Sequence, residues 1–315
     1  MSADTDRRAP LPLLGRLGAF LELGKVKIVE LWIGFFVALS LLRKGAASEP
    51  REQLLLLITL VSMVVVAALT CSLDDIAGAR DGVDRANHLG ESRWGVDKPI
   101  LTGRLSERRA LAFARVLGAL ALFGYAAVVA LAWPLPPWVI LTTTGVALLA
   151  VNYSYGLRLS YRGAGELVVL AAGAGTLLVP YGLVERAAPG GLVLCNAALI
   201  GAWQAQVVLC SNSLDAAGDR ATGRWTLAAR LSPLHNRVFV SAVFAVVWGY
   251  TAAALIAGVL PLALAFFLAP VWVMQGYQLW LGVFHGEWQK ARRAGFRVVR
   301  LGAAALILAN LILFE

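Results

Sequence analysis

The chain has 315 residues, of which 59% are hydrophobic and 15% are charged, and its mean hydropathy is +0.72. Soluble domains carry about 25% charged residues, so this composition excludes an ordinary soluble protein and indicates an integral membrane protein. The formal net charge is +9. Such an excess would suit a nucleic-acid partner only if the cations were gathered on one soluble face.

Nine apolar runs are each long enough to cross a bilayer, which takes about 20 residues. We therefore predict an all-α integral membrane protein with nine transmembrane helices. The runs cover residues 26–42, 53–72, 110–133, 136–153, 165–184, 192–211, 237–257, 260–281 and 297–314. Residues 1–23 contain Pro10 and Pro12 and lack the apolar core of a signal peptide. They are predicted to be a cytoplasmic arm without fixed structure, ahead of a single domain at residues 24–315.

The cations are distributed unevenly between the two sides of this nine-span arrangement. Of the 28 lysines and arginines, only Arg43, Lys44, Arg51 and Arg186 fall on the side opposite the N-terminus. Cytoplasmic segments of membrane proteins carry the excess of Lys and Arg. The N-terminus and the loops at about 73–109, 154–164, 212–236 and 282–296 are therefore predicted to be cytoplasmic, at a plasma membrane. The basic excess is explained by topology, so we expect membrane lipid around the chain and no nucleic acid.

Two similar acidic segments follow two of the apolar runs, about 140 residues apart. Asp75-Ile76-Ala77-Gly78-Ala79-Arg80 aligns with Asp215-Ala216-Ala217-Gly218-Asp219-Arg220. This similarity predicts an internal duplication, with two pseudo-repeated four-helix halves and one additional helix. A carboxylate costs roughly 2.5–3.5 kcal/mol at the centre of a membrane helix and less near its end, so its presence there indicates function.

The spacing of these carboxylates favours a divalent cation. Asp215 and Asp219 are four residues apart and share one helix face. Two carboxylates about 6 Å apart repel by roughly 2.8 kcal/mol at an effective dielectric constant of 20, so a cation is expected between them. Mg²⁺ prefers oxygen ligands and binds through one or two carboxylates together with substrate phosphates. The predicted metal ligands are Asp74, Asp75, Asp81, Asp84, Asp215 and Asp219.

Basic side chains occur in the same predicted cytoplasmic loops. Lys98, Arg220 and Arg224 are placed to bind phosphate oxygens that the metal leaves unpaired. Arg158 lies in a tyrosine-rich loop after the fourth span, which must fold back over the acidic segments. These residues predict a site for an anionic, phosphate-bearing substrate.

Three of these segments resemble the UbiA-type intramembrane prenyltransferases. Asp215 to Leu227 is similar to that family's second motif, DxxxD followed by GD-R-x-x-G-x-x-T-L. Lys98 to Ser106 is similar to its [RK]-P-x-x-x-G-x-[IL]-[ST] segment, and Tyr155 to Glu166 resembles its Y-x-x-x-x-R-L-K-Y-R-G-x-G-E stretch. The resemblance covers nearly the whole chain. It implies nine helices around a central cavity, a polyprenyl diphosphate held through Mg²⁺, and an aromatic or similar acceptor that is prenylated as pyrophosphate leaves.

The resemblance also implies roles for individual residues. The implied catalytic residues are Asp74, Asp75, Asp81, Asp215, Asp219 and Tyr153, and the implied diphosphate-binding residues are Lys98, Arg158, Arg162, Asn212, Arg220, Arg224 and Tyr155. The aromatic residues expected to line the cavity and steady a carbocation are Tyr153, Tyr155, Trp203, Trp272 and Tyr277. The family's first motif is NDxxDxxxD, whereas this chain has DDxxGxxDGxD without the leading Asn. Asn212 is expected to supply an amide in its place.

The sequence allows several interpretations of what happens to the carbocation formed from the prenyl diphosphate. An acceptor could be prenylated, or the cation could attack its own double bonds, as in a terpene cyclase on the same scaffold. A lipid-phosphate sugar or a haem-like acceptor is a third reading. A membrane transporter is an alternative from another class, although its charges would be expected near mid-span and these carboxylates lie at helix ends.

Overall fold

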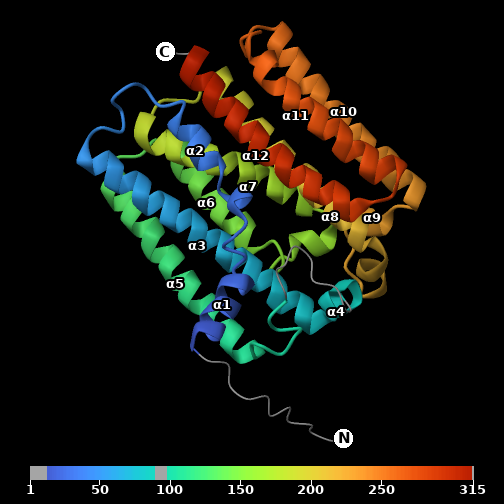
Figure 1. The fold of residues 1–315 in the computed structure, drawn as a ribbon. Helices are drawn as coiled ribbons and strands as arrows, with labels where there is room; N and C mark the ends of the chain where they lie inside the picture. The colour runs from blue at the N-terminus through green and yellow to red at the C-terminus, as the bar shows by residue number, and fades with distance from the viewer. Residues whose placement is uncertain (1–12, 89–97, 314–315) are drawn as a thin grey trace, which may run out of the picture.

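A computed structural model of the chain describes residues 13–88 and 98–313, and these residues are almost entirely helical. Figure 1 shows the helices side by side in a bundle, with α4 and α9 near one end of it. The helices are α1 Leu13–Leu23, α2 Gly34–Leu39, α3 Pro50–Asp81, α4 Val83–His88, α5 Glu107–Ala132, α6 Pro137–Val151, α7 Gly165–Glu185, α8 Gly191–Ala221, α9 Leu227–Arg230, α10 Pro233–Ile256, α11 Leu264–Leu279 and α12 Trp288–Leu313. Short helical turns occur at Val29–Leu31, Leu159–Arg162 and Trp280–Phe284.

Seven helices in the described part of the chain are long and apolar enough to cross a membrane: α3, α5, α7, α8, α10, α12, and α11 extended to Phe284 by a π-helical turn. The chain is thus an all-helical membrane protein, as predicted. The fourth predicted span is the shorter apolar helix α6. The first is not a continuous helix, so the described residues contain seven long spans where nine were expected.

The first apolar run contains a buried charged residue at the point where the helix is interrupted. Glu30 is buried, and its carboxylate binds Arg300 of α12. The backbone carbonyl of Glu30 accepts a hydrogen bond from Gln204 Nε2 at 2.7 Å. That carbonyl is bonded to a side chain from α8 instead of an amide in its own helix, and the run divides into the turn Val29–Leu31 and the short helix α2.

The helix of the last predicted span extends nine residues farther toward the N-terminus than the span itself. Helix α12 starts at Trp288, not at residue 297. Arg293, Arg297 and Arg300 lie on its exposed side, whereas Ala291 and Ala294 are buried. The charged residues therefore lie on one face of an amphipathic helix and do not mark a loop.

The N-terminal arm is partly ordered, which corrects the expectation of an unstructured segment for residues 13–23. These residues form α1, and Ala19 and Leu23 are fully buried. They pack in one hydrophobic cluster with Leu69 and Leu73 of α3. Residues 1–12 lie outside the described residues. Helix α1 thus belongs to the bundle and places the turn that follows it beside the end of α3.

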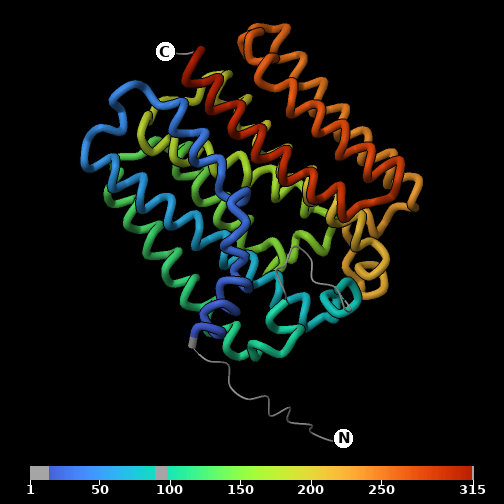
Figure 2. The backbone as a smooth tube through the Cα atoms, in the orientation of Figure 1, coloured from blue at the N-terminus to red at the C-terminus, as the bar shows by residue number. Residues whose placement is uncertain are grey.

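The two longest helices, α3 and α8, carry the two acidic segments at their C-terminal ends. Helix α3 begins with Pro50 in its first turn and ends at Gly82, whose φ of 78° is the left-handed conformation that glycine adopts easily at a helix end. Figure 2 follows both helices toward the same end of the bundle. We call this the acidic end. At the opposite end, Arg43 binds Glu185 at 2.6 Å.

Helices α7 and α8 pack closely because glycines face each other between them. A Cβ atom on Gly201 would lie 2.2 Å from the backbone oxygen of Leu170. A Cβ atom on Gly173 would lie 2.8 Å from the Gly201 Cα atom. Small residues allow this approach of two backbones in membrane proteins, and it fixes α8, with its acidic segment, against α7.

Gly201→Ala should destabilise the protein, because the added methyl group meets backbone and not a movable side chain. Overpacking of this kind costs about 1–3 kcal/mol, so the thermal midpoint of the purified protein in detergent should fall. Gly249→Ala in α10 is the matched control, since nothing lies within 4 Å of its added Cβ. It should leave the midpoint unchanged or raise it slightly. Equal midpoints for the two variants would contradict this account of the α7–α8 contact.

Candidate active site

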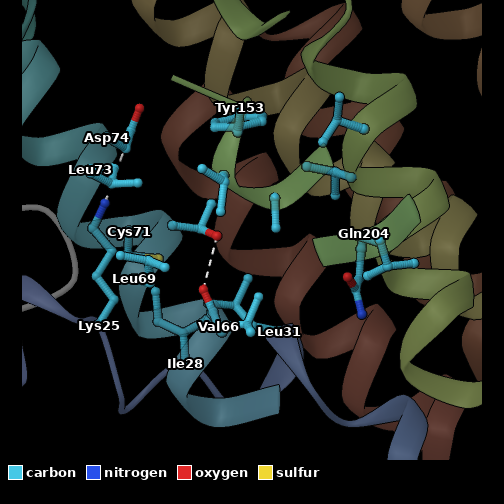
Figure 3. A pocket seen from close by; sticks show the side chains of 18 of the residues that line it. Lys25, Ile28, Leu31, Val66, Leu69, Cys71, Leu73, Asp74, Tyr153 and Gln204 are labelled. Atoms are coloured by element: carbon cyan, nitrogen blue, oxygen red, sulfur yellow. Dashed lines mark hydrogen bonds and ion pairs between the residues drawn. The ribbon is translucent and has the colours of Figure 1, made fainter. Parts of the chain in front are cut away.

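One cavity of about 820 Å³ opens at the acidic end and extends into the bundle between α3, α5, α6, α7, α8 and α12. Eight charged residues line it: Lys25, Glu30, Asp74, Asp84, Lys98, Asp215, Arg224 and Arg292. Farther from that end the lining is mainly Val, Leu, Ala and Thr. Figure 3 shows apolar side chains of α3 between Lys25 and Gln204. The cavity therefore has a charged mouth at the acidic end and a mainly apolar interior, in which Glu30 is paired with Arg300.

Asp74 faces the cavity and is bound from three sides. Ser154 Oγ donates a hydrogen bond to its Oδ1 atom at 2.6 Å. Arg224 Nη2 lies 3.9 Å from the same oxygen, and Lys25 Nζ lies 3.8 Å from Oδ2. Figure 3 shows the Lys25 side chain directed toward Asp74. These partners come from the loop after α6, the segment after α8 and the turn after α1, so the site depends on the whole fold.

Asp75 is turned away from the cavity and is almost completely buried, with 2% of its surface exposed. Its Oδ1 atom accepts from Lys98 Nζ at 2.7 Å and pairs with Lys25 Nζ at 3.0 Å. Lys98 Nζ also donates to Asp84 Oδ1 at 2.8 Å. The two lysines thus connect the end of α3, helix α4 and the segment before α5.

The buried charges of this group modify each other's protonation. Burial raises the pKa of Asp84 to about 6, although the Lys98 ammonium acts in the opposite direction. Burial alone would lower the pKa of Lys98, but the carboxylates of Asp75 and Asp84 outweigh it, and the pKa is raised. Lys98 therefore stays a cation throughout the neutral range.

The second acidic segment is bound mainly by neutral groups at Asp219. Asn87 Nδ2 donates to Asp219 Oδ1 at 2.8 Å, and Thr226 Oγ1 lies 3.3 Å from Oδ2. Asp215, one turn earlier on α8, lines the cavity, as does Asn87. The amide of Asn87 therefore lies between the cavity and the buried Asp219.

Asp81 lies outside the cavity lining and binds Arg158. The guanidinium of Arg158 stacks on the Tyr161 ring at 3.8 Å, and that of Arg224 lies over the same ring at 5.0 Å. Tyr161 therefore holds two arginines in place at the acidic end. Only Arg224 of the two lines the cavity.

The structure separates the other predicted residues into two sets. Tyr153, Tyr155 and Asn212 line the cavity, and Asn212 Nδ2 donates to Glu166 Oε1 at 2.8 Å. Arg220 instead donates to the backbone carbonyls of Ala229 and Leu231, at 2.8 and 3.0 Å.

Arg162 is exposed, and its backbone carbonyl accepts a hydrogen bond from Arg230. Neither Arg162 nor Arg220 lines the cavity. Trp203, Trp272 and Tyr277 are also absent from the lining, and Trp203 packs against Gly302 in the hydrophobic core. Of the predicted aromatic lining, the cavity therefore holds Tyr153 and Tyr155.

The second acidic segment fits a magnesium ion that also binds a substrate. Within residues 13–88 and 98–313, no group of three or more His, Cys, Asp and Glu side chains converges closely enough to hold a metal alone. Mg²⁺ commonly uses only one or two carboxylates and completes its shell with water and substrate phosphates. Asp215 lines the cavity and offers one such carboxylate, and Asp219, one helical turn later, is buried behind Asn87 as a second.

The cavity also opens sideways between α5 and α6. Leu122 of α5 and Leu148 of α6 line it, yet their side chains are 73% and 59% exposed on the outer surface of the bundle. About one turn farther from the acidic end on each helix, Tyr125 and Thr144 share a hydrogen bond of 2.9 Å. This bond bridges the two helices and limits the opening to the half nearer the acidic end.

Three residues of the site were not predicted from the sequence: Lys25, Ser154 and Asn87. Lys25 lies just before the first apolar run, where a lysine usually indicates only the orientation of the span in the membrane. Its only distinctive feature is a φ of 48°, which is uncommon for a residue other than glycine and is visible only in the structure. Ser154 lies in the tyrosine-rich loop after the fourth predicted span, between the predicted site residues Tyr153 and Tyr155, so its position was a signal that could have identified it.

Similar folds occur among solved membrane proteins. A digeranylgeranylglyceryl phosphate synthase superposes with a TM-score of 0.60 at 14% identity, covering 94% of this chain and 99% of that one. A UbiA homologue from Archaeoglobus fulgidus bound to DMAPP and Mg²⁺ gives 0.60 at 15% identity, covering 89% and 99%. An apo UbiA homologue from Aeropyrum pernix K1 gives 0.61 at 17% identity, covering 90% and 98%. At such identities the likeness shows a shared fold.

No curated protein matches the chain. The sequence profile of the UbiA prenyltransferase family, however, matches residues 31–301, which is most of the chain. It spans both acidic segments and every helix from α2 to the middle of α12. The chain therefore belongs to the UbiA prenyltransferase family, whose members are enzymes that transfer prenyl groups.

Proposed function

We propose that this enzyme uses Mg²⁺ to ionise a prenyl diphosphate and transfers the prenyl group to an aromatic acceptor, with release of pyrophosphate. The observation that carries the proposal is the division of one cavity into a charged mouth and an apolar interior. A prenyl diphosphate has the same division between its head and its chain. The family membership supports the reaction class.

The diphosphate is proposed to lie at the acidic end, between the two acidic segments. Arg224 and Lys98 line the cavity there as cations. The Arg224 Nε atom is buried without a hydrogen-bond partner, so a donor is available for a phosphate oxygen. A buried donor without a partner is costly, and an anionic ligand would relieve that cost.

The proposed metal ligands are Asp215 and Asp219, and Asn87 holds the Asp219 carboxylate in position. The Archaeoglobus fulgidus homologue was solved with DMAPP and Mg²⁺, which supports the choice of ion. Mg²⁺ bound here would neutralise the charge that develops on the departing pyrophosphate.

The residues of the chain have further roles in the proposed reaction. Cationic side chains aimed at the leaving group stabilise the transition state without reorganisation. Tyr153 and Tyr155 present aromatic faces at the mouth of the cavity, where an allylic cation would form. The apolar lining beyond them excludes water and protects that cation from quenching.

The prenyl chain is proposed to follow the apolar interior and to leave the bundle between Leu122 and Leu148. These leucines face the cavity and also the outer surface, so a long chain could extend from the cavity into lipid. The acidic end and the N-terminus are proposed to lie on the cytoplasmic side, which the excess of cations in the loops at that end supports.

The testing experiment incubates the purified protein in detergent with Mg²⁺ and geranyl, farnesyl or geranylgeranyl diphosphate, with and without aromatic acids or quinone precursors. We expect pyrophosphate release only when an acceptor is present. A cyclised or hydroxylated terpene formed without acceptor would replace this proposal with a terpene cyclase. Substrate that stays intact under every condition would contradict the proposal.

Asp219→Ala should reduce turnover by at least about 100-fold, the scale of losing one group that stabilises transition-state charge. Asp215→Ala should have a similar effect. Arg186→Ala is the control, because Arg186 caps the far end of α7 and should retain full activity. Full turnover by the Asp219 variant would show that the metal assignment is wrong.

Leu148→Trp should narrow the lateral opening and discriminate against long chains. We expect kcat/KM for geranylgeranyl diphosphate to fall at least about 10-fold relative to geranyl diphosphate, since clashes of a few methylene groups carry such penalties. Leu141→Trp is the matched control, because Leu141 is also an exposed leucine of α6 but does not line the cavity. Parallel changes for the two substrates would argue against this exit route.

A further inference from the structure

The two acidic segments differ in the kind of group that binds their carboxylates. At the first, Lys25, Lys98 and Arg224 lie within 4 Å of Asp74, Asp75 and Asp84. Within the part of the chain that the structure describes, three cationic side chains thus face three carboxylates. At the second segment, the neutral side chains of Asn87 and Thr226 donate hydrogen bonds to the Asp219 carboxylate.

Lys25 is placed in the first segment by the fold. Helix α1 packs on α3 through Ala19 and Leu23, and the turn after it brings Lys25 Nζ to 3.0 Å from Asp75 Oδ1. The left-handed backbone of Lys25, with φ of 48°, is a conformation that a lysine rarely adopts. Such a conformation persists where the surrounding structure requires it and is a reason to look for function.

Asp75 cannot serve as an ordinary metal ligand in this arrangement. One of its oxygens is shared by two ammonium groups, at 2.7 and 3.0 Å. The other, Oδ2, is buried without a hydrogen-bond partner and does not face the cavity lining. Lys98 also binds Asp84 at 2.8 Å. A divalent cation added here would meet two fixed positive charges within the same buried cluster, which is unfavourable.

We propose that the first acidic segment binds no divalent cation, because Lys25 and Lys98 supply its positive charge. The enzyme then holds divalent metal only through the second segment. The two ammonium groups are the cations that the diphosphate meets on the α3 side. An ammonium has three N–H donors, so Lys25 can retain Asp75 and still donate to a phosphate oxygen. This inference rests on the proposed function, and it assigns a diphosphate-binding role to Lys25, which precedes the region matched by the family profile.

The test counts bound Mn²⁺ by electron paramagnetic resonance in the purified, full-length protein with unreactive geranyl thiolodiphosphate. Wild type should bind one tight Mn²⁺ per chain. Asp219→Asn should abolish that binding, and Asp75→Asn should retain it. Lys25→Met should allow a second Mn²⁺ to bind at least 10-fold more tightly than in wild type. Lys27→Met is the matched control, because Lys27 is exposed two residues away, and it should match wild type.

Two tight Mn²⁺ ions in wild type would overturn the inference, as would loss of the single ion in Asp75→Asn. A Lys25→Met protein that still binds one ion would overturn the role of Lys25 in excluding the second. If Lys25→Met does not fold, the pair Asp75→Asn and Asp219→Asn decides the question alone. The metal count does not depend on turnover, so its failure is distinguishable from failure of the proposed reaction.

Discussion

The burial of Asp75 is the constraint on which the acidic end of the bundle depends. A carboxylate removed from water costs several kcal/mol unless a cation and hydrogen bonds offset the loss, and Asp75 is almost fully buried at the end of an apolar helix. Its partners come from distant segments, Lys25 from the turn after α1 and Lys98 from the segment before α5. One buried charge therefore ties three separate parts of the chain together, and it explains why the N-terminal helix is packed into the domain.

The two helices that carry the acidic segments are similar in length, but the groups around their carboxylates differ in charge. Helices α3 and α8 have nearly the same length and end in carboxylates at the same end of the bundle. Ammonium groups bind Asp75, whereas an amide and a hydroxyl bind Asp219. Neutral donors stabilise a carboxylate without cancelling its charge, so Asp219 remains suited to a metal ion.

Patterns of neighbouring residues in the sequence predicted the features that depend on neighbouring residues alone, such as helices and their ends. Hydropathy located the seven long spans, and the acidic repeats located both helix ends at the site. Lys98 and Arg224, two of the residues predicted to bind diphosphate, line the cavity. The pattern could not show that Glu30 would break the first span, because its partner Arg300 lies 270 residues away. Nor could it separate Arg224 from Arg220, since an arginine bonded to backbone carbonyls and one facing a cavity look alike in the sequence.

The lateral opening and the charged mouth lie in the same half of the bundle, and this arrangement bears on the proposed chemistry. The hydrogen bond between Tyr125 and Thr144 closes the α5–α6 seam farther from the acidic end. A chain that leaves between Leu122 and Leu148 therefore turns into lipid soon after the diphosphate site. The reacting carbon would then be flanked by fixed charge on one side and hydrocarbon on the other. Hydrocarbon and the apolar lining keep water from the prenyl chain, which is the condition a carbocation needs to survive until an acceptor reaches it.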